Sequence, residues 1–378
     1  MSEDGVLVTG PVMAGRAGGS ADRTSRPRRW LLHLCELVLV GLMAACTPSL
    51  DAAPDENAGS GSGEGAAPSG SVRLYVANRY EGVLRLDPAT LAILDTIDTG
   101  PRPHGMVPAP DGRTLFITVE ASDELLEVDV ATHAIRRRVQ VGSVPNEPTI
   151  SVDGRRVFVP LRGGDHTAVV DTDTFTVIGE IPAGAMEHNA YTSANGTHVY
   201  LTSMGDRTVT VADPTTLEVV KRIPMGGVPR PMAILEDESI AYVALSSLLG
   251  FVTVDLQAGR VVDRLEKPIP AGTPVPPLDT YTHGMLLGPN ERELWVAAYA
   301  TRTVYAYLVP ERREFAAIPV EGGPHWFALH PDGEPLYVTL ENTGKVAAIH
   351  RGLREVLRTR KVCEAPTRMV VFRTPVGD

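Results

Sequence analysis

A 42-residue repeat runs through most of the chain and constrains its fold more strongly than any other feature. The seven copies of the repeat begin at Gly100, Gly142, Gly184, Gly226, Asp279, Glu321 and Cys363. Successive copies lie 42 residues apart, except that an insertion of 11 residues within residues 267–281 delays the fifth copy. Because each copy of such a repeat is one structural unit, the chain is predicted to assemble seven similar units.

Each repeat carries apolar residues at every second position, which indicates β-strands. In the first repeat we expect four strands, over residues 104–109, 115–119, 124–130 and 135–141. Turn residues such as Pro110-Asp-Gly112 separate them. Four antiparallel strands in 42 residues have the size of one β-propeller blade. No helix longer than one turn is indicated after residue 72.

The two ends of the repeat region complete one another. Residues 74–78, 83–87 and 93–98 supply three strands without a first strand before them, whereas residues 368–373 supply a first strand with nothing after it. Pairing these segments would form a composite seventh blade and remove the open sheet edges at which chains aggregate. The sequence therefore predicts an all-β, seven-bladed β-propeller over residues 72–378, with four antiparallel strands in each blade.

Four segments at equivalent places share a tyrosine that follows an aliphatic or small residue. They are Leu74-Tyr-Val-Ala-Asn78, Val199-Tyr-Leu-Thr-Ser203, Ala241-Tyr-Val-Ala-Leu245 and Leu336-Tyr-Val-Thr-Leu340. In these segments the chain resembles the YVTN-type repeat family of seven-bladed β-propellers. The resemblance implies the propeller fold over residues 72–378. It implies no single function, because relatives include surface-layer modules, periplasmic binding proteins and a few enzymes.

The N-terminal segment has the order of an export signal. Arg28 and Arg29 precede an apolar run over residues 30–45, which at 16 residues is too short to span a bilayer comfortably. The run ends in Leu42-Met-Ala-Ala-Cys46, which resembles the lipobox of bacterial lipoproteins. This resemblance implies that residues 1–45 are a signal peptide and that the thiol of Cys46 is acylated. Ordinary secretion is the alternative.

The segment that follows the signal is built mainly from small and polar residues. Residues 46–71 contain Pro, Ser, Ala, Gly and Glu with almost no large apolar side chains, so we expect a flexible tether. These features predict a monomeric lipoprotein of the cell envelope, anchored to the membrane through Cys46 and facing the periplasm or the cell exterior. The acidic balance, with 35 Lys and Arg residues against 46 Asp and Glu, argues against a nucleic-acid partner.

Common catalytic and cofactor motifs are missing from the sequence. Three cysteines cannot form a disulfide scaffold or a four-cysteine zinc site. Neither a Gly-x-Ser-x-Gly nucleophile motif nor a phosphate-binding loop occurs. Candidate chemistry must therefore come from side chains that the repeat itself brings together.

One residue of every repeat is expected to face the central channel, because the first strand of each blade lines it. The fifth position of the seven copies holds His104, Asn146, His188, Arg230, His283, His325 and Thr367. Ten histidines in 378 residues would place fewer than one at these positions by chance, whereas four occur. We therefore predict a ligand-binding mouth formed by His104, Asn146, His188, Arg230, His283, His325 and Arg368.

Three interpretations of this histidine ring remain open. In the first, the mouth is simply polar, and histidine suits the turn into the first strand. In the second, a transition metal such as copper or zinc is bound by His104, His188, His283 and His325. That arrangement is similar in outline to the histidine-lined propeller centre of nitrous-oxide reductases. In the third, the imidazoles join Arg230 and Arg368 in a pocket for a carboxylate or phosphate.

Loops after the second strands should open on the same face as the ring. They carry Arg79, Tyr80, Glu120, Arg162, Asp206, Tyr299, Arg302, Glu341 and Asn342. The favoured function is a non-catalytic binding module that offers this mouth to a small ligand or an envelope protein. The alternative is a metal-dependent or lactonase-like enzyme. Propeller lactonases have similar repeats, but none of their catalytic residues is matched here.

Overall fold

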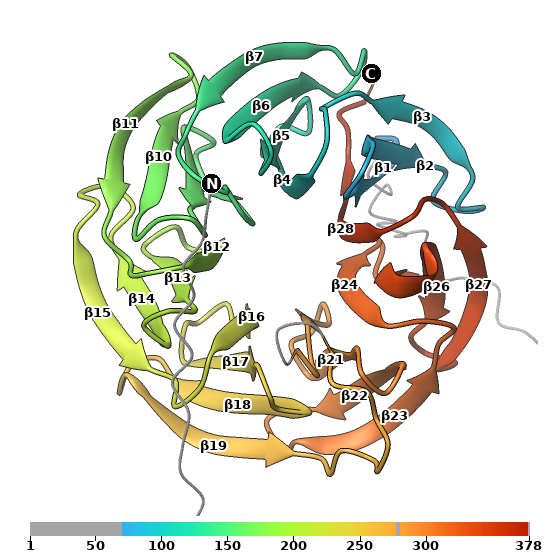
Figure 1. Ribbon diagram of the computed structural model, residues 1–378. Coiled ribbons are helices and arrows are strands. Elements are labelled where there is room, and N and C mark those ends of the chain that lie inside the picture. The colour runs from blue at the N-terminus through green and yellow to red at the C-terminus, as the bar shows by residue number, and fades with distance from the viewer. Residues whose placement is uncertain (1–69, 277–279, 377–378) are drawn as a thin grey trace, which may run out of the picture. The chain divides into compact units, whose positions relative to one another are not determined.

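The chain forms a ring of seven β-sheets around a central channel (Figure 1). The computed structural model describes residues 70–276 and 280–376. Each sheet has four strands, and neighbouring strands within a sheet run antiparallel. In the described residues, helical structure is limited to a 3₁₀ turn at Glu341–Thr343. The predicted all-β, seven-bladed propeller is confirmed.

Six blades are continuous in sequence, and their strands follow one another from the channel to the outer rim. The first blade consists of β4 (Pro103–Pro108), β5 (Thr114–Val119), β6 (Glu124–Asp129) and β7 (Ile135–Gln140). The second consists of β8 (Thr149–Ile150), β9 (Arg156–Pro160), β10 (Thr167–Asp171) and β11 (Thr176–Ile181). The third consists of β12 (Glu187–Thr192), β13 (Val199–Ser203), β14 (Thr208–Ala212) and β15 (Val219–Pro224). The fourth blade consists of β16 (Pro229–Ile234), β17 (Ile240–Leu245), β18 (Gly250–Asp255) and β19 (Arg260–Glu266). The fifth consists of β20 (Gly284–Leu287), β21 (Glu293–Ala298), β22 (Thr303–Leu308) and β23 (Arg313–Pro319). The sixth consists of β24 (Pro324–Leu329), β25 (Leu336–Leu340), β26 (Lys345–His350) and β27 (Glu355–Lys361).

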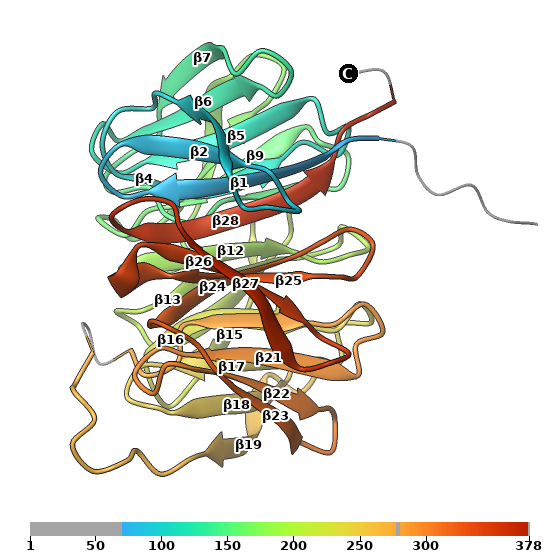
Figure 2. The same ribbon diagram turned by 90° about the vertical axis from the view of Figure 1, so that its right-hand side faces the viewer.

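The seventh, composite blade joins the two ends of the propeller. Strand β28 (Pro366–Arg373) lies at the channel and pairs antiparallel with β1 (Val72–Asn78), which is followed by β2 (Gly82–Leu86) and β3 (Ile93–Ile97). Figure 2 shows β1 and β28 side by side. Beyond the paired residues, the backbone N–H of Thr374 donates to the carbonyl of Ser71 at 2.9 Å. The predicted closure of the ring is therefore confirmed.

Apolar side chains between neighbouring blades form the core. In β5, Leu115 and Ile117 belong to a cluster with Tyr75 of the composite blade, whereas Phe116 packs with Val159 of the second blade. Alternate residues of one strand thus fill two different interfaces, and both faces of the middle strands are apolar. Truncating a fully buried leucine at such a place costs about 2–5 kcal/mol. This packing holds neighbouring blades together, and the inner strands of the blades carry the channel residues.

A β-bulge marks the beginning of several inner strands. In β4, His104 and Gly105 together lie opposite the single residue Thr118 of β5. The hydroxyl of Thr118 accepts a hydrogen bond from the N–H of Gly105 and donates one to the carbonyl of Asn146 in the second blade, each at 2.8 Å. The register shifts at the equivalent place in β12, β16, β24 and β28. Because a bulge re-aims the side chains that it contains, the repeat directs equivalent residues towards one mouth.

The expected signal peptide, with the lipobox and Cys46, lies outside the described residues, as does the tether up to residue 69. In residues 70–276 and 280–376, no helix has the length and apolar character needed to cross a membrane. Export and lipid anchoring therefore stay predictions.

Candidate binding site at the channel mouth

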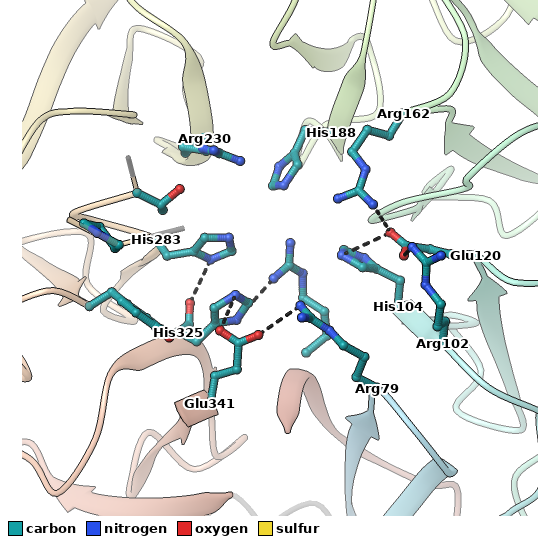
Figure 3. Close-up of a pocket in the computed structure, with 14 residues that line it drawn as sticks. Arg79, Arg102, His104, Glu120, Arg162, His188, Arg230, His283, His325 and Glu341 are labelled. Carbon is teal, nitrogen blue, oxygen red and sulfur yellow. Dashed lines mark hydrogen bonds and ion pairs between the residues drawn. The ribbon is translucent and has the colours of Figure 1, made fainter. Parts of the chain in front are cut away.

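A cavity of about 390 Å³ opens at one mouth of the channel. All four histidines of the ring line it, and they come from the first, third, fifth and sixth blades (Figure 3). The other lining residues are Arg79, Arg102, Glu120, Arg162, Arg230, Pro276, Thr280, Tyr299, Glu341 and Arg368. The repeat thus brings together residues that are more than 200 positions apart in the sequence.

Two of the ring positions do not reach the cavity lining. Asn146 is fully buried, and its side-chain amide donates to Glu120 Oε1 at 3.3 Å. Thr367 donates through its hydroxyl to the carbonyl of Ala77 at 3.3 Å, so its role is to join β28 to β1. Asn146 was an expected ligand-binding residue; in the structure it supports the glutamate that lines the cavity.

Five of the nine expected loop residues line the cavity. They are Arg79, Glu120, Arg162, Tyr299 and Glu341, whereas Tyr80, Asp206, Arg302 and Asn342 are not part of the lining. Pro276 and Thr280 of the lining belong to the insertion within residues 267–281, whereas the sequence pattern did not indicate Arg102. The position of Arg102, two residues before His104, is a signal that could have indicated it.

Burial keeps the four imidazoles uncharged. Desolvation, as the largest cause, holds the pKa values of His104, His188 and His283 well below 6.5, and it lowers that of His325 to about 4. Nearby positive charges act in the same direction, with Arg368 contributing at each of the four. At neutral pH each imidazole therefore has one N–H and one nitrogen that can accept a hydrogen bond.

The charges that line the cavity are predominantly positive. Glu120 Oε2 lies 2.5 Å from Arg102 Nη2, and its Oε1 lies 2.8 Å from Arg162 Nη2. Glu341 Oε1 lies 2.9 Å from Arg79 Nη2 (Figure 3). Five arginines and two glutamates line the cavity, so arginines outnumber carboxylates there even when Glu147, which binds Arg368 from outside the lining, is included.

Arg368 is the most deeply buried of these cations, with 1% of its surface exposed. Its Nε donates to Glu147 Oε2 at 2.8 Å, and its guanidinium carbon lies 4.1 Å from the centre of the Trp326 ring. Its Nη2 has no hydrogen-bond partner. Burial lowers the pKa of Arg368, and it raises that of Glu147 to about 7 although Arg368 pulls that value down. The guanidinium of Arg368 is thus held in place by Glu147 at its Nε, whereas its Nη2 has no hydrogen-bond acceptor.

The Arg368–Glu147 pair reaches from the composite blade past the first blade to the second blade. A glycine in the first blade makes the close packing possible, because a Cβ at Gly105 would lie 2.3 Å from Pro148 Cδ and 2.7 Å from Glu147 Cα. Gly284, which also follows a ring histidine, approaches the carbonyl of His325 in the same way, at 2.8 Å from an added Cβ. The His-Gly order in the sequence therefore serves packing between blades.

The geometry of the histidines does not form a ready metal centre. The rings of His283 and His325 stack with centres 3.7 Å apart and planes 18° apart, and the rings of His188 and His104 lie 6.5 Å apart. Stacked parallel rings direct their nitrogen lone pairs alongside one another rather than towards a common point. Among the described residues, no group of three or more His, Cys, Asp or Glu side chains could hold a metal ion. Metal binding stays a prediction without a preformed cluster behind it.

Comparison with known proteins supports the architecture. Residues 66–272 match the model of the YNCE-like beta-propeller family. The chain is similar to the periplasmic gluconolactonase PpgL of Pseudomonas aeruginosa, with 21% identity and a TM-score of 0.65 over 81% of this chain and 100% of that one. It is also similar to hydrazine synthase of Kuenenia stuttgartiensis, with 19% identity and a TM-score of 0.61 over 72% of this chain and 96% of that one.

A third similar structure is a functionally unknown protein from Desulfotomaculum acetoxidans, with 12% identity and a TM-score of 0.68 over 80% of this chain and 100% of that one. No curated protein matches the chain. At these identities the structural likeness extends to the fold alone.

Proposed function

We propose, from a chain that belongs to the YNCE-like β-propeller family, that the protein is a module that binds a small organic anion at its channel mouth. The proposal is drawn from the site itself, because the propeller fold serves many functions. The excess of arginine over glutamate around the cavity carries this proposal. The cavity volume of about 390 Å³ lies in the range of small-molecule sites. Carboxylate and phosphate are the groups that arginine binds best.

The burial of Arg368 supports the same conclusion. A buried cation is costly unless it is paired and hydrogen-bonded on every side, and Nη2 of Arg368 has no partner. A negatively charged ligand would supply that partner and would recover part of the cost. The uncharged imidazoles around Arg368 supply further hydrogen-bonding groups for a ligand without adding charge to the cavity.

Titration calorimetry with purified protein tests the proposal. Citrate, malate, gluconate and phosphate are the anionic probes, and glucose is the neutral control. We expect heat and saturation with at least one anion and none with glucose. Arg162→Gln should weaken that binding, whereas Arg302→Gln, outside the lining, should leave it unchanged. Absence of binding by every anion, or equal binding of glucose, would contradict the proposal.

A lactonase-like enzyme is the second candidate. It is favoured by the similarity to a structure named as a gluconolactonase and by two imidazoles that lie beside carboxylates. Nε2 of His104 lies 3.9 Å from Glu120 Oε1, and Nε2 of His325 lies 3.9 Å from Glu341 Oε2. A neutral imidazole can take a proton from water as the water attacks an ester carbonyl.

Hydrolysis of glucono-δ-lactone, followed by acid release, separates the two candidates. Turnover that is lost in His325→Asn would favour the enzyme, and binding of the product acid without turnover favours the module. Elemental analysis of untagged protein decides the metal alternative. Stoichiometric copper or zinc would support it, whereas metal-free protein that binds the anion would not.

We also propose that the protein is a lipoprotein of the cell envelope, anchored through Cys46. The proposal is supported by the lipobox-like segment and the tether that follows it. In a bacterial host, Cys46→Ala should release the protein from the membrane fraction and abolish labelling by a fatty-acid analogue. A membrane-bound Cys46→Ala variant, together with an unlabelled wild type, would contradict it.

A further inference from the structure

Backbone contacts determine which nitrogen of two ring histidines carries the proton. Nδ1 of His283 lies 3.1 Å from the backbone carbonyl of His325, and Nδ1 of His325 lies 3.0 Å from the backbone carbonyl of Thr367. A carbonyl oxygen can only accept, so each Nδ1 must be the N–H. These bonds link neighbouring blades at an interval of 42 residues, one repeat, in both cases.

The second nitrogen of each ring, Nε2, is therefore a bare acceptor. Both side chains line the cavity, and Figure 3 shows the imidazole of His283 directed into it. Nε2 of His325 lies 3.9 Å from Glu341 Oε2, which is too far for a hydrogen bond, and that carboxylate is an acceptor as well. This side of the cavity thus presents two imidazole nitrogens that can accept a hydrogen bond from a ligand.

The guanidinium of Arg368 presents the opposite chemistry beside them. Its Nη1 lies 3.4 Å from His325 Nδ1, but that nitrogen already carries a proton and cannot accept another. Nη2 is without a partner. Two adjacent N–H groups that both need an acceptor match the two oxygens of one carboxylate.

We propose that the site selects hydroxy acids, in which a carboxylate binds Nη1 and Nη2 of Arg368 and a hydroxyl of the same molecule donates to Nε2 of His283 or His325. This inference rests on the proposed anion-binding function and names its ligand class. A fully ionised inorganic anion would satisfy the arginine but would offer no donor to the imidazoles. An amine would meet the acceptors but would be repelled by the surrounding arginines.

Three four-carbon dicarboxylates form a matched series for the test. Succinate, malate and tartrate carry the same charge at neutral pH and have none, one and two hydroxyl groups. One net hydrogen bond of about 1 kcal/mol corresponds to about a fivefold change in affinity. In titration calorimetry with the full-length protein, we therefore expect at least one enantiomer of malate or tartrate to bind about fivefold tighter than succinate.

The role of the imidazole acceptors is tested by two variants, each of which keeps the hydrogen-bond donor of one histidine and removes its acceptor. In His283→Asn, the amide NH₂ stands near the position of Nδ1 and can still donate to the carbonyl of His325, while the acceptor at Nε2 is gone. His325→Asn does the same for the carbonyl of Thr367. We expect both variants to keep the thermal midpoint close to that of the wild type, and at least one to bind malate and succinate with equal affinity.

The outcomes separate this inference from the function on which it rests. Equal binding of the three acids by the wild type would overturn the hydroxy-acid selection and leave anion binding intact. Selection that survives in both asparagine variants would overturn the assignment to His283 and His325. If phosphate binds while none of the hydroxy acids malate, tartrate, gluconate and citrate does, the carboxylate placement at Arg368 fails. If no anion binds at all, the proposed function itself fails.

Discussion

The channel mouth and the outer rim of the propeller treat charged side chains in opposite ways. At the rim, Arg264 and Glu266 of β19 form an ion pair at 2.9 Å while 47% and 52% of their side chains stay exposed. At the mouth, Arg368 is almost fully buried, is bound to Glu147 and keeps an unpaired Nη2. Water solvates the rim pair at little cost, whereas the mouth holds charge away from water without pairing it completely. The comparison teaches that burial, rather than charge alone, distinguishes the mouth, and this is the observation from which anion binding is proposed.

The largest expected effect comes from removing the acid of the buried pair. Glu147→Ala leaves the guanidinium of Arg368 buried without its carboxylate, so the free energy of unfolding should fall by about 3–5 kcal/mol. Glu266→Ala at the rim is the matched change, and it should cost at most about 1 kcal/mol. Urea unfolding followed by circular dichroism measures both. Equal losses in the two variants would remove the distinction between mouth and rim.

A smaller effect is expected from glycine substitutions at the two places. Gly105→Ala would place a Cβ 2.3 Å from Pro148 Cδ, and the resulting overpacking should cost about 1–3 kcal/mol. Gly352, in the turn between β26 and β27, has no atom closer than 3.4 Å to an added Cβ, so Gly352→Ala should change stability by less than about 0.5 kcal/mol. Thermal unfolding of the two variants measures the difference. A Gly105→Ala variant as stable as the wild type would show that the second blade can move away.

Acid should destabilise the mouth through its histidines. Burial lowers the pKa of His325 to about 4 and holds those of His188 and His283 well below 6.5. Between pH 6.5 and 4 these histidines bind protons in the unfolded chain but stay unprotonated in the folded chain. The free energy of unfolding therefore decreases as the pH falls. Burial raises the pKa of Glu147 to about 7 and of Glu187 to about 8, and their contribution has the opposite sign, because it is lost as the pH rises above 4.5.

Four buried histidines outnumber these two acids, so we expect the midpoint temperature of unfolding to decrease as the pH is lowered from 6.5 to 4.5. His325→Asn should reduce the slope of the midpoint against pH. His350→Asn, at the more exposed end of β26, is the control at the rim. Parallel slopes for His325→Asn and the wild type would mean that His325 takes up its proton equally in the folded and unfolded states.

The smallest effect concerns a half-exposed arginine of the mouth. The side chain of Arg79 is 47% exposed and is paired with Glu341, so solvent screens its charge. Arg79→Gln should weaken binding of an anionic ligand by at most about fivefold, and added salt should reduce the difference. Arg138→Gln at the rim, where the side chain is 44% exposed, should leave affinity unchanged. Equal weakening in both variants would point to a general field of the protein instead of a local site.

Much of the frame of the site could be predicted because the repeat places its residues. The interval of 42 residues located the four histidines, Arg230 and the loop positions of Glu120 and Glu341, and all of them line one cavity. Asn146 occupies the same repeat position but turns to Glu120, because the residues around it differ from blade to blade. Arg102 escaped prediction because it lies just before the first strand of its blade and joins the mouth through its ion pair with Glu120.

The sequence by itself determined the architecture: strands from the alternation of apolar residues, blades from the period, and closure from the complementary ends. These depend on local patterns that recur, so they can be read without knowing any contact. Only the tertiary structure decided that Arg368 crosses the first blade to Glu147, that its Nη2 is left unpaired, and which nitrogen of His283 and His325 carries the proton. Those properties arise from burial and from contacts between different blades: the repeat spaces the contacting residues, but it does not determine which of their atoms meet.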